Sequence, residues 1–314
     1  MRVVTAEEID RVLTPPALID ALHDAFRGDF VVPTRHHHTI SCPGADATLL
    51  MMPAWTSTGA PFLGCKLVTV FPDNNSRGEA SVQGQYLLMS GETGKPLAII
   101  DGPALTAWRT ACASALATRF LARKDAAHLV MVGSGTLAPH LIRAHASVRP
   151  LTRISLWNRT KAHAIELAFR LAEDGCEIEV VPDLEAAIRS ADIVSCATLS
   201  ATPLVRGAWL KPGAHVDLVG GFTPQMREAD DDAVRRARIY VDTRSGALKE
   251  AGDIIDPMVR RVISDTAVLG DLFELCRGTV SGRASENEIT LFKSVGTAVE
   301  DLAAAMLVWR CLGN

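Results

Sequence analysis

The sequence predicts an α/β protein in which a β-rich domain accompanies a second domain built on a doubly wound parallel sheet. Two observations support this prediction. Short β-like runs, punctuated by Gly, Pro and Asn, fill residues 35–100, and from residue 128 onward apolar strand-like runs alternate with helix-like segments. Repeated strand–helix units of this size favour parallel strands joined by right-handed crossovers.

The N-terminal segment TAEEIDRVLTPPALIDALHDAF has the pattern of helical structure. Thr5 is placed as an N-cap, and Glu8, three residues later, completes a capping box. Helical spacing then relates the apolar residues Leu18, Ile19, Leu22 and Phe26.

Four β-like runs follow: ATLLMMPAW, FLGCKLVTVFP, SVQGQYLLMS and PLAIIDG. The segment from Gly91 to Gly94 fits a hairpin connection between the last two runs. The next segment, PALTAWRTACASALATRFLAR, is rich in Ala and Leu and predicts a long helix.

The alternating part of the chain contains the strand-like runs HLVMVG, RISLWN, EIEVVP, DIVSCAT, HVDLVG and RIYVD. Helices are expected between them over residues 136–148, 160–174, 183–190 and 229–236. Near the end, ENEITLFKSVGTAVEDLAAAMLVWRCLG is interpreted as one long apolar-striped helix. The expected domains are residues 1–115 completed by 286–314, and residues 116–285.

Bulk composition narrows the class of protein. The 314 residues are 48% hydrophobic and 22% charged, with a formal net charge of −4, which argues against general binding to nucleic acids or anionic membranes. No apolar run approaches the roughly 20 residues of a membrane span, and acids stand where a signal peptide would be apolar. The seven cysteines never form CxxC. We therefore expect a soluble cytoplasmic protein with reduced thiols and no metal site, although three histidines adjoin at His36, His37 and His38.

The loop Gly133-x-Gly135-x-x-Ala138 follows a buried-strand run and opens a helix-like segment. By itself this pattern is weak, because it also fits a tight turn that binds nothing. Its position between a strand and a helix favours a Rossmann-type dinucleotide site over a turn that binds nothing. In such a site bare backbone lets a pyrophosphate approach the N–H groups of the helix N-terminus.

The end of the next strand bears on the choice of dinucleotide. Twenty residues after Ala138 the chain reads Asn158-Arg159-Thr160, where an NAD-preferring site usually has an acid. A guanidinium beside an amide and a hydroxyl suits a 2′-phosphate, so NADP(H) is expected over NAD(H). The alternative is that Arg159 is only a solvated charge at a strand end.

Three cations of the first domain stand among apolar neighbours: Arg35, Lys66 and Arg109. A buried lysine is costly unless it is paired, so Lys66 requires an anionic partner. That partner is either an internal Asp or Glu, which is the more common case, or the carboxylate of a substrate.

The motifs LGCK, RTACASALATRFLAR, GSGTLA, WNRT, VDLVGGFTPQMRE and LFKSVGTAVEDLAAA together resemble the ornithine cyclodeaminase/mu-crystallin family, in the right order over nearly the whole chain. The resemblance implies a homodimer built through the first domain, a nicotinamide dinucleotide on the second, and an amino-acid or cyclic imino-acid substrate between them. It implies that Arg35, Lys66 and Arg109 hold the substrate carboxylate. It also implies a cofactor site formed by Ser81, Thr110, Gly133, Ser134, Gly135, Thr136, Leu137, Asn158, Arg159, Thr160, Thr198, Val219 and Ser294.

Two positions depart from the cyclodeaminases of the family, which carry an acid before a Met-Pro pair and another after Val-Gly-Gly. Here these positions are Leu50 and Phe222. Cyclodeamination needs an acid/base group near the reacting carbon. The absence of both acids therefore favours the ketimine-reductase branch of the family, which this chain resembles most closely at LVGGFTPQMRE. That branch reduces Δ1-pyrroline-2-carboxylate to L-proline, and the six-membered homologue to L-pipecolate.

In this interpretation Phe222 would exclude water and fit the ring methylenes, while the three cations orient the ring. The proton reaches the imine nitrogen either with the substrate or through Lys66. Other activities of the superfamily stay open, namely alanine or N-alkyl amino-acid dehydrogenase and ornithine cyclodeaminase. So does a non-catalytic, crystallin-like role in which the cofactor is merely bound. The resemblance suggests a place in hydroxyproline or D-amino-acid degradation.

Overall fold

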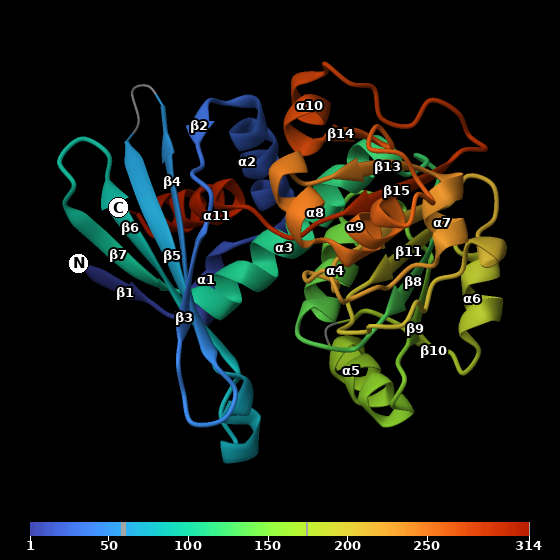
Figure 1. Cartoon of the computed structure of the whole chain (residues 1–314), viewed down its shortest axis with the longest axis horizontal. Coiled ribbons are helices and arrows are strands. Elements are labelled where there is room, and N and C mark those ends of the chain that lie inside the picture. The colour runs from blue at the N-terminus through green and yellow to red at the C-terminus, as the bar shows by residue number, and fades with distance from the viewer. Residues whose placement is uncertain (58–60, 174, 314) are drawn as a thin grey trace. The chain divides into compact units, whose positions relative to one another are not determined.

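A computed structural model describes residues 1–57, 61–173 and 175–313 of the chain (Figure 1). The chain forms two compact units. Unit 1 comprises Met1–Arg109 and Thr297–Asn314, and unit 2 comprises Thr110–Gly296. The helix α3 (Gly102–Leu121) passes from the first unit into the second.

Unit 1 is built on a sheet that has seven strands within the described residues. All its pairs are antiparallel except the pairing of β1 with β7. The strand order is β1 (Arg2–Val4), β7 (Pro96–Asp101), β6 (Val82–Ser90), β5 (Phe62–Val70), β4 (Ala47–Thr56) and β2 (Phe30–Val31), with β3 (His36–Ile40) also paired to β4. A short 3-10 helix, η1 (Pro72–Arg77), follows β5. The four predicted strand runs and the hairpin between the last two are confirmed.

Besides the first part of α3, unit 1 contains the helices α1 (Ala6–Val12), α2 (Pro15–Arg27) and α11 (Ala298–Cys311). The predicted capping box of Thr5 and Glu8 begins α1, and the chain starts α2 with Pro15 in the first turn. The four apolar residues predicted to share a helical face are all buried in α2. Helix α11 packs against α2 and against β4, β5 and β6, so it covers one face of the sheet (Figure 1).

Side chains alternate between the two faces of the sheet along each strand, so strand pairing aligns a different row of residues on each face. On the face that α11 covers, strand pairing places Lys66 opposite Met52 on one side and Tyr86 on the other, all of them buried. On the opposite face the same pairing aligns five apolar residues across five strands, each half-buried or exposed: Pro53, Cys65, Leu87, Ile99 and Val3.

Unit 2 is built on a sheet that has eight strands among the described residues, and all its neighbouring pairs are parallel. The first five positions reproduce the 3-2-1-4-5 part of the strand order of a Rossmann fold. The sixth position is occupied by β15, the last strand of the unit in sequence, and β13 and β14 lie beyond it. The order is β10 (Glu179–Val180), β9 (Arg153–Trp157), β8 (His128–Val132), β11 (Ile193–Cys196), β12 (His215–Leu218), β15 (Ile289–Lys293), β13 (Ala237–Val241) and β14 (Val268–Asp271).

The connections of unit 2 are mostly helical. The four helices predicted from the alternating pattern are confirmed to within two residues at each end, as α4 (Leu137–Ala146), α5 (Lys161–Glu173), α6 (Leu184–Ser190) and α7 (Asp231–Arg236). Four further helices of the described residues were not predicted: η2 (Gly207–Trp209), α8 (Arg244–Glu250), α9 (Gly252–Val259) and α10 (Leu272–Arg277). The described helices include none long and apolar enough to cross a membrane. All seven cysteines are free thiols.

The prediction of one long helix near the C-terminus is wrong in its first half. Residues Ile289–Lys293 form β15, which lies between β12 and β13, and the helix begins only at Ala298. The run ITLFK consists largely of β-branched and aromatic residues and is buried on all sides, as expected for an interior parallel strand. A short buried run of this kind has no periodicity that separates it from a buried helix.

Candidate functional site

The glycine loop after β8 makes a tight turn that the fold itself requires at Gly133. This residue has φ of +105°, and a side chain there would place Cβ 2.7 Å from the carbonyl oxygen of Ala197. Its N–H donates a hydrogen bond of 2.9 Å to the carbonyl of Trp157. The close approach of three strand ends therefore explains the first glycine without any ligand.

Gly135 differs, because a Cβ there would meet no atom within 4 Å. Its φ lies outside the left-handed region, so neither packing nor backbone geometry of the chain demands glycine. The adjoining helix α4 begins at Leu137 after Thr136, whose side chain makes no capping hydrogen bond. An open glycine before a helix N-terminus without a side-chain cap fits a dinucleotide's phosphates, which need both space and N–H donors.

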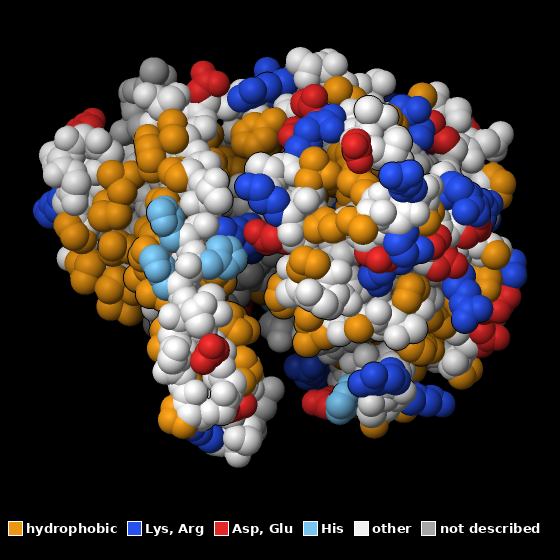
Figure 2. Space-filling view, in the orientation of Figure 1, with side chains coloured by type: hydrophobic (Ala, Val, Ile, Leu, Met, Phe, Trp, Pro, Cys, Tyr) orange, Lys and Arg blue, Asp and Glu red, His pale blue; other side chains and the backbone are white. Residues whose placement is uncertain are grey.

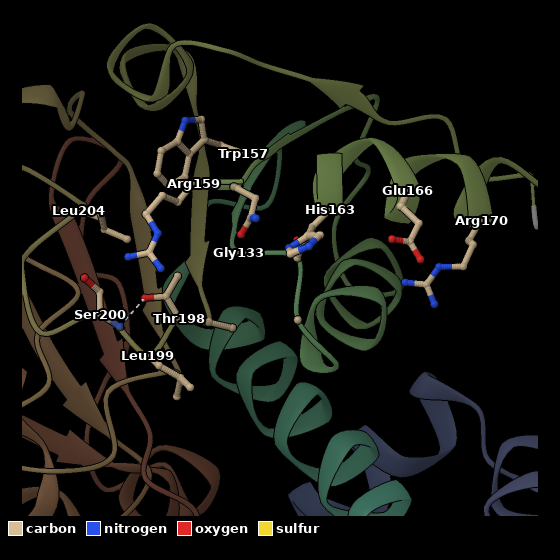
Figure 3. A pocket seen from close by; sticks show the side chains of 14 residues that line it. Gly133, Trp157, Arg159, His163, Glu166, Arg170, Thr198, Leu199, Ser200 and Leu204 are labelled. Atoms are coloured by element: carbon tan, nitrogen blue, oxygen red, sulfur yellow. Dashed lines mark hydrogen bonds between the residues drawn. The ribbon is translucent and has the colours of Figure 1, made fainter. Parts of the chain in front are cut away.

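A cavity of about 450 Å³ opens beside this loop in unit 2 (Figure 3). It brings together six of the residues predicted for the cofactor: Gly133, Ser134, Gly135, Asn158, Arg159 and Thr198. Figure 3 shows Arg159 on one side and three residues of α5 following one another on the other, His163, Glu166 and Arg170. Sequence reasoning missed these three, although their spacing over one and two helical turns was a signal.

Other predicted cofactor residues lie at the ends of strands. Val219 follows β12 and donates its N–H to the carbonyl of Cys196, and Ser294 follows β15 and donates to Leu218. Both are buried at the edge of the sheet where the parallel strands end. Thr110 is buried in α3, and Thr160 is exposed after β9. Ser81 belongs to unit 1, directly before β6.

Two of the three predicted cations of unit 1, Lys66 and Arg109, contact a carboxylate that sequence reasoning missed. Asp301, in the first turn of α11, lies 2.9 Å from Nζ of Lys66 and 3.1 Å from Nε of Arg109. Arg109 also contacts Glu300 at 2.7 Å through Nη1. Arg35 is near enough for its positive charge to lower the pKa of Asp301.

Burial and charge oppose each other in this cluster. Burial lowers the pKa of Lys66 to about 8, and the neighbouring Asp301 limits that fall. Burial disfavours the ionised form of Asp301, but Lys66 and Arg109 outweigh it, so the pKa of Asp301 is lowered overall. The cluster therefore joins the cations Lys66 and Arg109 to the carboxylates of Asp301 and Glu300, and Arg35 adds its positive charge near Asp301.

The partner that Lys66 was predicted to need is therefore internal. The signal in the sequence was the pair Glu300 and Asp301, the only acids in the otherwise apolar run VEDLAAAMLVW. In an amphipathic helix such acids usually face solvent, but here both are buried.

These features agree with the family comparison, in which residues 2–312 match the ornithine cyclodeaminase/mu-crystallin family. The chain belongs to this family. The two positions at which cyclodeaminases of the family were expected to differ lie in separate units. Leu50 lies on β4, opposite Val68, and Phe222 lies in the segment after β12 and is 47% exposed.

Members of the family with named activities are similar over most of the chain. The Δ1-pyrroline-2-carboxylate reductase of Paracoccus denitrificans is 39% identical over 292 residues, which is 93% of this chain and 92% of that protein. The structure of the Δ1-pyrroline-2-carboxylate reductase of Thermococcus litoralis, in complex with NADH and L-proline, matches with a TM-score of 0.92 at 32% identity, and covers 99% of this chain and 97% of that one.

An archaeal alanine dehydrogenase dimer with bound NAD also matches the fold. Its TM-score is 0.89 at 28% identity, over 99% of this chain and 95% of that chain. Proteins named for different reactions thus have this fold, and the choice between the reactions depends on the site residues. No group of His, Cys, Asp and Glu suited to hold a metal occurs among the described residues, the three histidines of β3 included.

Proposed function

We propose that this protein reduces cyclic imino acids with a nicotinamide dinucleotide, converting Δ1-pyrroline-2-carboxylate to L-proline and Δ1-piperideine-2-carboxylate to L-pipecolate. The observation that carries this proposal is the cluster in which Lys66 and Arg109 share the buried Asp301, with the positive charge of Arg35 close enough to act on the same carboxylate. The named reductases among the relatives support the same reaction.

In this proposal the three cations bind the substrate carboxylate and fix the orientation of the ring. Asp301 contacts both Lys66 and Arg109, so it holds their charged groups in place before the substrate arrives. The reduced nicotinamide supplies the hydride that forms the new C–H bond, and the imine nitrogen takes a proton. One additional ring methylene changes binding in an apolar pocket by only about 1–3 kcal/mol, so both ring sizes should react.

The apolar residues at two positions argue against cyclodeamination. Leu50 and Phe222 stand where cyclodeaminases of the family were expected to have acids. Releasing ammonia from an acyclic diamino acid requires a group that accepts and returns protons. Reduction of a preformed C=N bond needs less from the protein, because the bond is already conjugated with the carboxylate.

For the cofactor, we propose binding along the carboxyl ends of the strands of unit 2, with NADP(H) preferred and NAD(H) accepted. Arg159 lines the cavity beside the glycine loop and is exposed there. A guanidinium at this position suits the 2′-phosphate of NADP, whereas the usual ribose-binding acid is missing.

We also propose that unit 1 forms a homodimer through the outer face of its sheet, which is the face opposite the one that α11 covers. Exposed apolar side chains lie on this sheet, among them Val3 at 67%, Leu67 at 40% and Trp55 at 38% exposure. Figure 2 shows hydrophobic side chains gathered over the strands of this unit. Apolar residues on both faces of a sheet are typical of a sheet covered on both sides, and a second copy would cover the outer face.

The test is turnover of a substrate panel with the purified full-length protein. NADPH and NADH oxidation should be measured with freshly generated Δ1-pyrroline-2-carboxylate and Δ1-piperideine-2-carboxylate, and with pyruvate plus ammonia or methylamine. Ornithine should be incubated with NAD and the formation of proline and ammonia measured, because that reaction has no net change in NAD. The proposal expects the cyclic imines to have the highest kcat/KM, with NADPH above NADH. Faster turnover of pyruvate with an amine, formation of proline from ornithine, or no turnover at all would contradict it.

A further inference from the structure

A single buried carboxylate in unit 2 joins two loops at the ends of neighbouring strands. Glu228 accepts hydrogen bonds from the N–H and the hydroxyl of Thr198 at 2.7 and 2.8 Å, in the loop after β11. Its other oxygen accepts from the N–H groups of Gly220 and Gly221 at 2.8 and 3.3 Å, in the segment after β12. The two segments are so close that a Cβ at Gly220 would lie 1.9 Å from the carbonyl oxygen of Thr198.

Two further buried charges hold Glu228. Asp253, in α9, accepts from the backbone N–H groups of Glu228 and Ala229 at 2.8 and 3.0 Å. Lys293, the last residue of β15, places its ammonium 3.3 Å from Asp253 and 4.0 Å from Glu228. All three side chains are fully buried, and their contacts join the ends of three adjacent strands, β11, β12 and β15.

The electrostatics of the trio explain why it contains a lysine. Burial raises the pKa of Glu228, and the nearby Asp253 raises it further, while Lys293 opposes both. Without the lysine, two carboxylates would compete for a proton in a dry environment. An ionised carboxylate can accept from all four donors on the two loops, whereas a protonated acid or an amide would turn one of its polar hydrogens toward a donor.

The position of these loops indicates what they do. In a Rossmann sheet, the half that carries the glycine loop, here β8, β9 and β10, receives the adenosine side of a dinucleotide, so the half formed by β11, β12 and β15 receives the nicotinamide side. Thr198 lines the cavity beside the glycine loop, and Val219 adjoins Gly220. We propose that Glu228, held by Asp253 and Lys293, is a positioning residue that fixes these two loops so that the nicotinamide ring is presented in the geometry for hydride transfer. This inference rests on the proposed function and extends it to residues with no substrate contact of their own.

The test separates the two halves of the dinucleotide in the variant Glu228→Gln. Binding of ADP-ribose and of adenosine 2′,5′-bisphosphate, which lack nicotinamide, should be measured by calorimetry beside kcat for Δ1-pyrroline-2-carboxylate. We expect fragment affinity within about twofold of the wild type, but kcat lower by roughly tenfold to a hundredfold, the range that follows from an ångström-scale misplacement. The isotope effect with C4-deuterated cofactor should rise, because hydride transfer becomes rate-limiting.

A matched control is Asp217→Asn, which alters another fully buried carboxylate of unit 2. Asp217 lies within β12 and accepts from the side chains of Ser114 and Ser195 rather than from the loops. It should lower the melting temperature without a change in the isotope effect. Lys293→Met should repeat the pattern of Glu228→Gln, and Thr198→Val, which removes one donor to Glu228, should show it in weaker form.

Three outcomes would overturn the inference. One is wild-type kcat and isotope effect in a folded Glu228→Gln protein. Another is a parallel loss of fragment binding and kcat, since that indicates only a damaged fold. The third is failure of Glu228→Gln and Lys293→Met to fold while Thr198→Val keeps wild-type kinetics. Failure of the wild type itself to bind either fragment or to reduce the imine would instead reject the proposed function, so the two failures are distinguishable.

Discussion

The carboxylate of Asp301 lies 2.9 Å from the ammonium of Lys66, and both side chains are almost completely buried. The two residues are 235 positions apart in the chain, and they meet because α11 packs against β5. Arg109 shares the same carboxylate. A cation cluster that an internal acid already holds in place is prepared to receive an external anion.

The first prediction concerns stability. Asp301→Asn should reduce the free energy of unfolding by about 3–5 kcal/mol, because it leaves buried cations without their carboxylate. Chemical denaturation at neutral pH measures the loss. Asp46→Asn, at an exposed position before β4, is the control and should change stability by no more than about 0.5 kcal/mol. Equal stability of the two variants would mean that the Asp301 contacts contribute little.

A second prediction is a pH dependence set by Lys66. The pKa of this group in the free protein is about 8, so it is cationic below that pH and loses its charge above it. Since a neutral amine binds a carboxylate weakly, kcat/KM should fall as pH rises through about 8. Lys66→Arg keeps its charge across this range. The pH profile of Lys66→Arg should therefore lack the fall in kcat/KM that titration of Lys66 causes, and retain only the change that titration of the substrate causes. Identical profiles for the wild type and the variant would exclude Lys66 as the group that sets the pH dependence.

Alanine substitution at the two glycines of the loop after β8 should affect different properties, stability at Gly133 and cofactor binding at Gly135. Gly133→Ala introduces a Cβ at positive φ against the carbonyl of Ala197, so the melting temperature should fall. Gly135→Ala meets nothing in the protein, so stability should hold while the KM for the dinucleotide rises by roughly tenfold or more. Thermal denaturation and cofactor titration check both. An unchanged KM in Gly135→Ala would support a turn without a phosphate.

Assembly can be tested at the outer face of the sheet of unit 1. Leu87 lies in the apolar row that crosses five strands, and Leu87→Asp would place a charge in the proposed dimer interface. Light scattering after size exclusion should give a dimer for the wild type and a monomer for this variant. Phe169→Asp, at a residue of α5 that is 67% exposed, is the control and should stay dimeric. A monomeric wild type would contradict the proposed assembly.

Much of the fold could be predicted because its signals are local. Alternating strand and helix patterns gave the parallel sheet, the turn glycines gave the hairpin between β6 and β7, and the capping box gave the start of α1. The strand β15 could not be assigned in this way. Its five buried residues have no diagnostic period, and its place between β12 and β13 depends on contacts distant in sequence.

The residues of the candidate site likewise fall into those that the sequence predicts and those that depend on tertiary packing. The cations were visible as charges among apolar neighbours, and the glycine loop was visible as a motif between a strand and a helix. Asp301 and Glu228 were not predicted because an acid on or near a helix usually faces solvent, and only tertiary packing buries these two. The sequence indicated that Lys66 needs an anionic partner, but the identity of that partner depends on how α11 packs against the sheet.

The central claim is that the cations of unit 1 bind the carboxylate of a cyclic imine, and Lys66→Met tests it most directly. The measurement is kcat/KM for Δ1-pyrroline-2-carboxylate and for Δ1-pyrroline, which has the same ring without the carboxylate, in the wild type and in the variant. Our account predicts a strong wild-type preference for the carboxylated ring, and a fall of that preference by roughly a hundredfold in Lys66→Met, as for loss of one buried charge pair. An unchanged preference in the variant would contradict it.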